Sequence, residues 1–206
     1  MQIGIINYNM GNLASVQNAF EAIGAKAQIQ KDPSKLSNYD KLILPGVGAF
    51  GDAAKNLENT GMKEAVLDFV KRGRYVLGIC LGMQLLFEKS QEFGEHKGLG
   101  LIKGEVIKFQ IEKSNLKIPH MGWNQCIFSE NASKHPLLKN IQDKTYLYFV
   151  HSYHALCADP QNLLAKCIYG YPFAAIVAKD NIFGLQPHPE KSHHEGLKIL
   201  KNFVTL

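Results

Sequence analysis

The amino-acid sequence predicts an α/β fold in which a mostly parallel sheet carries helices on both faces. Short apolar segments alternate with amphipathic segments of helical spacing through the first half of the chain, which is typical of a parallel sheet. The second half holds more apolar segments of strand length and ends in one further amphipathic segment. The chain has 206 residues and no repeat or linker divides it, so we expect one domain over residues 1–206.

In the first half, apolar spacing and helix-ending residues define the expected elements. Residues 2–6 form a short apolar strand, and Leu13 begins an apolar helical period that ends at Gly24, a residue suited to a helix C-terminus. The next elements expected, in order, are strands over 27–30 and 41–44, a helix capped by Asp52, a helix over 62–71, a strand over 75–79 and a helix over 81–90.

The second half is expected to be richer in strands. The expected elements are strands over 101–110, 125–128, 146–150, 164–168, 174–178 and 182–185, and a final helix over about 195–204. In open α/β sheets the reactive loops lie outside the carboxyl ends of the strands. The chemically interesting residues of this chain fall at such ends.

Composition argues against several classes of function. Apolar stretches are short and interrupted by Gly, Pro or charge, so no membrane span is expected, and no secretory signal begins the chain, which favours a cytoplasmic protein. The net charge of +5 is spread along the chain without an aromatic-rich basic stripe, so no nucleic-acid partner is expected. The four cysteines form no CxxC pair and are expected to be free thiols.

Cys80 lies within GICLG, between a predicted strand and a predicted helix. This is the cysteine counterpart of the nucleophile elbow G-x-S-x-G, where glycines let neighbouring backbone approach a strained turn. The start of the following helix favours a thiolate. An isolated cysteine is more often a small buried apolar residue, and we interpret Cys126, Cys157 and Cys167 in that way. For Cys80 the strand–turn–helix context favours an activated nucleophile.

A base for this nucleophile is expected in PHPEKS, residues 187–192. Residues i and i+2 of an extended chain point to the same side, so Glu190 can orient the His188 ring while the other ring nitrogen faces Cys80. The flanking prolines make the segment rigid. The result is a Cys–His–Glu set of nucleophile, base and orienting group.

A metal site is the competing interpretation, because His188, Glu190, His193, His194 and Glu195 are close in sequence. No HExxH or CxxC spacing is present, and adjacent histidines diverge both in a strand and on a helix. We therefore expect no metal and no cofactor, and we place the two adjacent histidines at the start of the last helix.

A loop with two glycines, PGVG at residues 45–48, follows the strand over 41–44. Its backbone N–H groups, together with that of Leu81, are candidates for stabilising a tetrahedral oxyanion. Taken alone, the segment also fits an ordinary tight turn. A phosphate-binding loop is not favoured, because G-x-x-x-x-G-K-[ST] does not occur.

With GICLGMQ, PGVGAF and HPEKS on one chain, the sequence resembles the class I (triad-type) glutamine amidotransferases. YNMGNLASV, GLGLIKGEVIKF, PHMGWN and YFVHSY make it similar to the glutaminase subunits of imidazole glycerol phosphate synthase, over nearly the whole chain. This resemblance implies a flavodoxin-like fold of the class I glutamine amidotransferase type. It also implies a heterodimer with a (β/α)₈ cyclase, which receives ammonia through a channel and makes imidazole glycerol phosphate and AICAR in histidine biosynthesis.

The resemblance also implies residue roles. It implies a catalytic triad of Cys80, His188 and Glu190, an oxyanion hole of Gly46, Val47, Gly48 and Leu81, and glutamine contacts from Gln84, Ser152 and Tyr153. The residues implied to face the partner are Asn12, Met121, Trp123, Tyr148 and Lys191. As the only tryptophan, Trp123 suits an interface anchor, although a lone tryptophan is more often a core residue.

Two segments depart from the family pattern. Pro187 stands where an aromatic residue commonly precedes HPE, and Asn7 and Asn9 stand in a segment that usually reads DYGMGN. Neither change removes a catalytic group, but they keep open a paralogous subunit that feeds ammonia to another partner, such as a sugar-amidinating enzyme. Two other hypotheses are a peptidase or γ-glutamyl hydrolase with the same Cys–His pair, and a regulatory subunit without chemistry, against which the intact triad argues.

Overall fold

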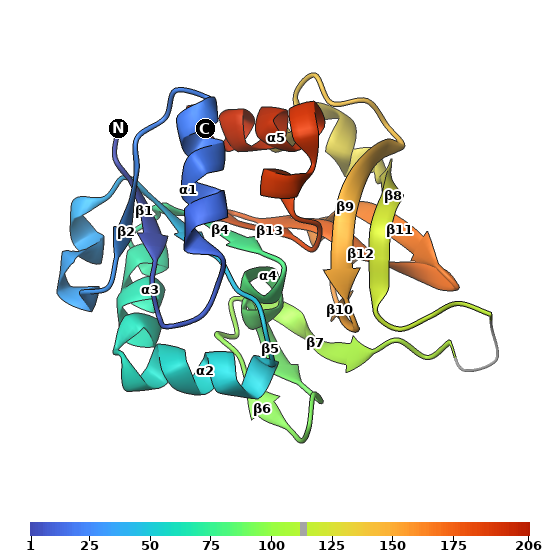
Figure 1. The fold of residues 1–206 in the computed structure, drawn as a ribbon, viewed down its shortest axis with the longest axis horizontal. Coiled ribbons are helices and arrows are strands. Elements are labelled where there is room, and N and C mark those ends of the chain that lie inside the picture. The colour runs from blue at the N-terminus through green and yellow to red at the C-terminus, as the bar shows by residue number, and fades with distance from the viewer. Residues whose placement is uncertain (112–114) are drawn as a thin grey trace.

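A computed structural model of the chain describes residues 1–111 and 115–206, with Ser133 described by its backbone only. Within these residues nine strands form one sheet in the order β2-β1-β3-β4-β13-β12-β11-β8-β9 (Figure 1). In that order the strands are β2 (Ala27–Gln30), β1 (Ile3–Ile6), β3 (Lys41–Leu44), β4 (Tyr75–Ile79), β13 (Ile182–Leu185), β12 (Tyr171–Lys179), β11 (Leu163–Tyr169), β8 (His120–Phe128) and β9 (Thr145–His151).

The large sheet is mixed. β2, β1, β3, β4 and β13 run parallel, whereas β12, β11, β8 and β9 continue the sheet with antiparallel pairs. Short turns such as the one at Gly170 join β11, β12 and β13, and a short turn can connect only antiparallel neighbours. The predicted α/β fold is confirmed, and its parallel part consists of the strands of the first half together with β13.

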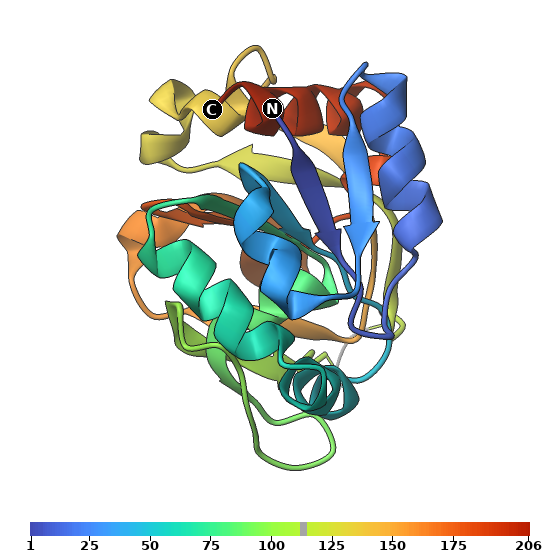
Figure 2. The same cartoon turned by 90° about the vertical axis from the view of Figure 1, so that its left-hand side faces the viewer.

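Helices cover both faces of the parallel part, as predicted (Figure 2). They are α1 (Leu13–Ala22), α2 (Phe50–Asn59), α3 (Met62–Lys71), α4 (Leu81–Leu85) and α5 (His193–Thr205). α1 and α5 bring Phe20 and Phe203 into one core, and α2 and α3 bring Phe50 and Phe69 into a second core on the other face. Among the described residues, no helix is long and apolar enough to cross a membrane.

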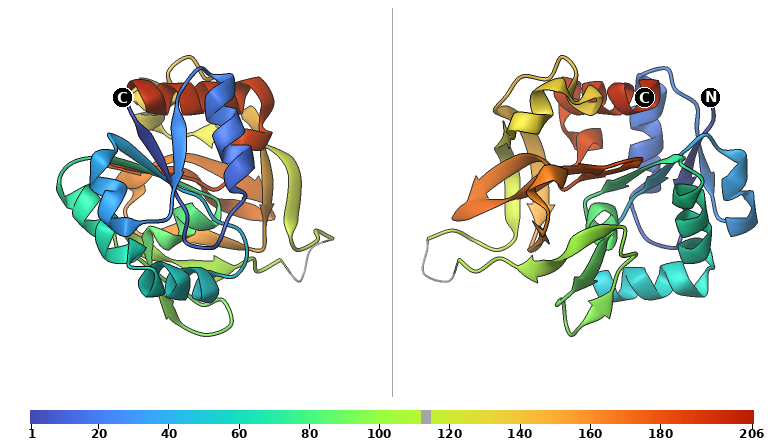
Figure 3. Two further views of the ribbon diagram at one scale, coloured as in Figure 1. Left: turned by 60° about the vertical axis from the view of Figure 1, so that its left-hand side comes forward. Right: turned by 180° about the vertical axis from the view of Figure 1, so that it is seen from behind.

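A second sheet was not predicted. Its strands are β10 (Tyr153–Cys157), β7 (Ile102–Lys108), β5 (Phe87–Ser90) and β6 (His96–Lys97), paired in that order. It lies on the side of α2 and α4 (Figure 3). The strand predicted over 101–110 corresponds to β7, whereas β5, β6 and β10 are too short or too polar to stand out in the sequence.

The helix predicted over 81–90 is wrong in its second half. α4 ends at Leu85, and Phe87 begins β5, which pairs with β6 and β7. Leu85, Leu86 and Phe87 are all fully buried, so their apolar run carries no period that separates a helix from a strand. The predicted ten-residue helix is therefore a five-residue helix followed by an edge of the second sheet.

The cap predicted at Asp52 is also wrong. α2 begins after Ala49, so Asp52 lies inside its first turn. The Phe50 N–H donates instead to the carboxylate of Glu92 at 2.6 Å. This contact joins the loop between β5 and β6 to the start of α2, a connection that local sequence does not indicate.

Other boundaries agree more closely. The last helix starts at His193, as predicted. β2, β3, β4 and β13 have the predicted bounds, and the ends of the other predicted strands lie within three residues of the expected positions. β8 is the exception, because it begins at His120 rather than at residue 125. Gly122 hides this extension in the sequence, but the backbone pairs with β9 from His120↔His151 onward.

The turn between β4 and α4 is packed against the end of β3. A Cβ atom added to Gly82 would lie 1.8 Å from the Leu44 carbonyl oxygen, and one added to Gly78 would lie 2.6 Å from the Gly82 carbonyl oxygen. Both positions therefore require glycine for close approach of backbone. This packing sets how near the loop after β3 comes to Cys80.

We expect Gly82→Ala to lower the free energy of unfolding by about 3 kcal/mol or more, because its methyl group meets backbone that cannot move aside. Gly24→Ala is the matched control: it has a positive φ of 76° but no atom within 4 Å of the added methyl, and it should cost only about 1 kcal/mol. Urea unfolding of both variants measures the difference. Equal losses would contradict the packing argument.

Candidate active site

Cys80 occupies a strained turn between β4 and α4, as the glycine pattern predicted. Its φ of 54° and ψ of −111° are unusual for a residue with a side chain. Its N–H donates to the Leu185 carbonyl of β13 at 2.7 Å. The sulfur lies near two polar groups, the Val150 carbonyl at 3.9 Å and the Gln186 Nε2 at 3.7 Å. Because α4 has only five residues, its dipole supports an anionic sulfur less than the predicted longer helix would.

His188 and Glu190 form a buried pair at η5 (Pro189–Lys191). His188 Nδ1 and Glu190 Oε1 are 2.7 Å apart, and both side chains are at most 4% exposed. Burial lowers the pKa of His188, but the Cys80 sulfur and the Glu190 carboxylate beside the ring outweigh it and raise this pKa to about 10. Among the described residues, His188 Nε2 has no well-aligned hydrogen-bond partner. The ring therefore has one nitrogen fixed by Glu190 and the other available beside Cys80.

The backbone around His188 is held by β9. The His188 N–H donates to the Tyr148 carbonyl at 2.8 Å. The Tyr148 N–H donates to Ser192 Oγ at 2.9 Å, and the Ser192 hydroxyl donates to the His188 carbonyl at 2.6 Å. These three hydrogen bonds link the backbone of His188, directly and through Ser192, to β9 at the edge of the sheet.

A cavity of about 430 Å³ brings most of the predicted site residues together. It is lined by Val47, Gly48, Cys80, Leu81, Gln84, Glu92, Pro119, Val150, His151, Ser152, Tyr153, His188 and Lys191. Glu190 lies behind His188 and not on the wall. Glu92, Pro119, Val150 and His151 were not predicted, and no local motif marks them, because they reach the cavity through the pairing of distant elements.

The PGVG loop contributes two of its predicted residues to the cavity wall. Val47 and Gly48 face the cavity next to Leu81, and Gly48 has a φ of 102° that favours glycine. Gly46 is buried behind them, where an added Cβ would lie 2.7 Å from the Tyr8 hydroxyl. That hydroxyl donates to the Pro45 carbonyl at 2.6 Å and so holds the start of the loop.

Gln84 links Tyr153 on the cavity wall to Gln186, which follows β13. Its Nε2 donates to the Tyr153 carbonyl at 2.9 Å and to the Gln186 Oε1 at 3.0 Å. Ser152 and Tyr153, the other two residues predicted to contact glutamine, line the same wall.

Two buried histidines extend this wall toward β8. His151 Nδ1 donates to the Tyr153 carbonyl at 2.8 Å, and His120 Nδ1 is 3.1 Å from His151 Nε2. Burial lowers the pKa of His151 to about 3 and that of His120 to about 4, so both rings are neutral at pH 7. Asn124 Nδ2 then donates to His120 Nε2 at 3.2 Å and completes the set.

Of the residues predicted to face a partner, Trp123 and Lys191 lie beside Tyr148, and Lys191 also lines the cavity. Met121 and Trp123 are 61% and 44% exposed, and the Trp123 ring lies 6.0 Å from that of Tyr148. Lys191 Nζ lies 6.0 Å from the Tyr148 ring centre. Asn12 is at the start of α1, where its side chain accepts from the Ser15 N–H at 3.3 Å.

The residues of the metal alternative do not converge. His188 and Glu190 are buried together, whereas His193 stacks on Trp123 with ring centres 5.0 Å apart. His194 pairs with Glu195 at the surface at 3.1 Å. Among the described residues, no three His, Cys, Asp or Glu side chains are placed to hold a metal ion.

The four cysteines are free thiols, as predicted. Cys126 and Cys167 are buried, and burial raises the pKa of both thiols, with that of Cys167 at about 12. Cys157 is only partly buried, and its thiol donates to the Asp159 carbonyl at 3.3 Å. These three positions are unlike Cys80, which alone among the cysteines lines the cavity with a base beside it.

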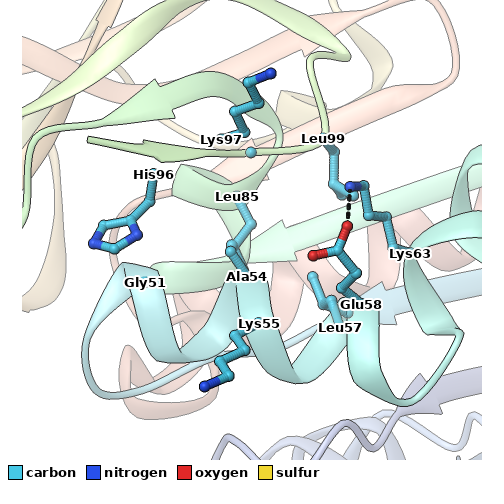
Figure 4. Close-up of a pocket in the computed structure, with 11 residues that line it drawn as sticks. Gly51, Ala54, Lys55, Leu57, Glu58, Lys63, Leu85, His96, Lys97 and Leu99 are labelled. Atoms are coloured by element: carbon cyan, nitrogen blue, oxygen red, sulfur yellow. Dashed lines mark hydrogen bonds and ion pairs between the residues drawn. The ribbon is translucent and has the colours of Figure 1, made fainter. Parts of the chain in front are cut away.

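A second cavity of about 220 Å³ lies between α2, α4 and β6 (Figure 4). Its floor is formed by Leu57, Leu85 and Leu99. Lys55 and Lys97 point away from each other in Figure 4, and Lys63 is paired with Glu58 at 3.0 Å. No set of polar groups converges there, so the Cys80 cavity is the candidate active site.

Comparisons with known proteins identify the family of the chain. Residues 5–206 match the family model for glutamine amidotransferase class-I. The chain is 59% identical over 204 residues to imidazole glycerol phosphate synthase subunit HisH of Sulfurimonas denitrificans, covering 98% of this chain and 97% of the relative. It is also 59% identical over 206 residues to the protein of the same name from Wolinella succinogenes, covering 99% of each.

Solved structures show the same fold at low sequence identity. The structure titled "Structure of PurLQS from Thermotoga maritima" has a TM-score of 0.77 at 21% identity and covers 99% of this chain and 97% of that chain. A second structure, titled "Crystal structure of glutamine amidotransferase", has a TM-score of 0.73 at 16% identity, with coverage of 98% and 97%.

The neutral histidine pair should make the fold sensitive to acid. The unfolded chain takes up these protons near pH 6.5, while the folded chain does so only near pH 3 to 4. The unfolded state thus binds more protons in between, and stability falls as pH drops through this window. We expect His151→Gln to reduce the slope of unfolding free energy against pH by up to about 1.4 kcal/mol per pH unit.

Urea unfolding at several values between about pH 6 and 4 measures this slope. His194→Gln serves as control, because the His194 side chain is 82% exposed. Its ion pair with Glu195 is screened by solvent, so its replacement should change the slope much less than that of His151. If the two variants have the same slope, the His151 ring does not remain neutral in the fold.

Proposed function

Because the chain belongs to the class I glutamine amidotransferases, we propose that it hydrolyses glutamine to glutamate and ammonia as the glutaminase subunit of an imidazole glycerol phosphate synthase, in histidine biosynthesis. One observation carries the proposal. His188 is fixed by buried Glu190 at 2.7 Å, and it shares a cavity with Cys80 on its strained turn. This is the arrangement of nucleophile, base and orienting group that acyl transfer requires.

The first half of the reaction forms a thioester. His188, with its pKa raised to about 10, carries a proton at neutral pH and favours an anionic sulfur beside it. The sulfur attacks the γ-carboxamide carbon, and the carbonyl electrons move to oxygen. Backbone N–H groups of Leu81 and the PGVG loop stabilise this oxyanion. His188 then gives its Nε2 proton to the nitrogen, ammonia leaves, and a γ-glutamyl thioester remains.

The second half releases glutamate. His188 is now neutral and takes a proton from water, and the oxygen of that water attacks the thioester carbon. The carbon–sulfur bond breaks, the electron pair returns to Cys80, and His188 is protonated again. Glu190 keeps its contact with Nδ1 throughout and so holds the ring with Nε2 toward the reacting atoms.

Glu92 is suited to hold the other end of glutamine. It is the one acidic residue among those that line the cavity within the described chain, so it is the natural partner for the α-ammonium group of an amino acid. Gln84, Ser152 and Tyr153 line the same wall. Glu92 also accepts from the Phe50 N–H at 2.6 Å, which fixes its carboxylate relative to α2.

The partner follows from the names of the relatives, each of which is described as a subunit. We infer a (β/α)₈ cyclase that forms a heterodimer with this chain and receives ammonia through a channel. Free ammonia would be protonated in bulk water, so a sealed path between the subunits is needed. The proposed contact surface is made by Asn12, Met121, Trp123, Tyr148 and Lys191.

Two alternatives are separated by simple assays. A paralogous subunit would hydrolyse glutamine but bind a different ammonia-using enzyme, and the 59% identity over nearly the whole chain favours the cyclase over it. A peptidase or γ-glutamyl hydrolase would cleave short γ-glutamyl peptides in preference to glutamine. Parallel assays of both substrates distinguish these activities.

We expect Cys80→Ala to reduce glutamine hydrolysis by at least about 10³-fold, because no other group can form the thioester. Glutamate release, measured with the partner subunit present, tests this. Cys157→Ala is the control, since Cys157 is a partly buried thiol outside the cavity, and it should keep wild-type activity. Hydrolysis that persists in Cys80→Ala would refute the triad.

We expect Trp123→Ala to weaken binding of the cyclase subunit by about 30-fold, as for a central aromatic anchor. Leu156→Ala is the control, because Leu156 is similarly exposed, 42% against 44%, but lies on β10. Calorimetric titration of each variant with the cyclase measures the affinity. If wild-type protein does not bind the cyclase, the paralogue hypothesis gains support; if both variants bind equally, Trp123 is not an anchor.

A further inference from the structure

Gln186 lies directly beside the reactive cysteine, although the mechanism above assigns it no part. It follows β13, which pairs in parallel with β4 in the register Leu185↔Ile79, so Gln186 and Cys80 leave the sheet side by side. Gln186 is fully buried, with 0% of its surface exposed. Its Nε2 donates to the Cys80 Sγ at 3.7 Å.

Neighbouring groups determine which way the Gln186 amide faces. The Tyr153 carbonyl can only accept, so the Gln84 group 2.9 Å from it must be the NH₂. The same NH₂ lies 3.0 Å from Gln186, and the atom that it meets there must be the Gln186 oxygen. The Gln186 NH₂ is therefore left facing the sulfur. An inverted amide would place two donors against each other at Gln84.

The Tyr153 carbonyl is itself fixed by the histidine pair. His151 Nδ1 donates to it at 2.8 Å, in addition to the bond from Gln84. These two donors use both lone pairs of the oxygen. Because His151 is neutral, its Nε2 accepts from His120 Nδ1 at 3.1 Å. A continuous series of donors and acceptors thus connects His120 on β8 to Cys80. Inverting the Gln186 amide would break the donor–acceptor match at Gln84.

We propose that Gln186 is a further catalytic residue, whose amide N–H stabilises the anionic Cys80 sulfur before it attacks and when it leaves the thioester. The inference rests on the proposed function and deepens it. A hydrogen bond to an ion is stronger than one between neutral groups. Unlike His188, which gives up its proton during the reaction, an amide keeps its N–H at every step. It also supports the sulfur where the five-residue α4 provides only a small dipole.

Gln186→Met tests the proposal, because methionine has a similar length and cannot donate a hydrogen bond. The measurement is the rate of iodoacetamide alkylation at Cys80 against pH, assigned by peptide mass spectrometry. We expect the alkylation profile to move to higher pH by about one to two units. The kcat for glutamine should fall by about 10- to 100-fold, with a smaller change in KM.

Asn181→Leu is the matched control for a purely structural effect. Asn181 precedes the same strand, β13, at its other end, and its amide donates to the Val70 and Arg74 carbonyls at 2.9 and 2.6 Å. Its loss should lower stability but leave the alkylation profile of Cys80 unchanged. A profile that moves equally in Asn181→Leu would mean that general loosening, and not a lost donor, shifts the sulfur.

Gln186→Leu provides a second variant that lacks both polar atoms of the amide. Leucine cannot donate to the sulfur, so the shift should be about as large as in Gln186→Met. Wild-type profiles in both Gln186 variants would overturn the proposal. The alkylation assay does not depend on glutamine, so failure of the proposed function appears separately, as wild-type protein that does not hydrolyse glutamine with its partner present.

Discussion

The left-handed backbone at Cys80 is the constraint on which the rest of the site depends. A φ of 54° at a residue with a side chain is strained and persists only where the surrounding structure enforces it. Here the Cys80 N–H is tied to β13 through Leu185 at 2.7 Å, and Gly82 allows the turn to press against the Leu44 carbonyl of β3. β3 leads into the PGVG loop, and β13 leads into Gln186 and His188. One turn therefore fixes Cys80 relative to both the PGVG loop and His188, the proposed sources of the oxyanion donors and the base.

The antiparallel strand β9 also helps to position His188. Tyr148 of β9 accepts from the His188 N–H at 2.8 Å, and its own N–H binds Ser192, whose hydroxyl holds the His188 carbonyl. The Tyr148 ring lies beside Trp123 and Lys191 at the proposed partner surface. The backbone of Tyr148 thus holds the proposed base, His188, while its ring forms part of the proposed partner surface. A partner bound at the proposed surface would therefore contact a residue that also holds the proposed base, His188.

Features of the fold and site that depend on neighbouring residues could be predicted from the sequence. Features that depend on contacts between residues far apart in sequence could not. The elbow at Cys80 and the His188–Glu190 pair follow from local backbone rules, and the helices and strands of the first half follow from apolar spacing. The helix over 81–90 failed because three adjacent apolar residues are buried in a row, which removes the period. Glu92 and Gln186 could not be found, because their roles come from contacts with Phe50 and Gln84, which lie 42 and 102 residues away in sequence.

The raised pKa of His188 bears on both the proposed reaction and the place where ammonia would be released. A buried ion pair rarely adds stability, because desolvation offsets its attraction, so the His188–Glu190 pair is better explained by function. The pKa of His188 is raised to about 10, above its usual 6.5. Relative to a neutral ring, protonation therefore stabilises the fold fully below pH 6.5, and this difference is lost as pH rises toward 10. At neutral pH His188 therefore holds the proton that the proposed mechanism gives to the departing ammonia. Lys191 lines this cavity and also lies against Tyr148, so the stored proton is used beside the surface through which the proposed partner would receive the ammonia.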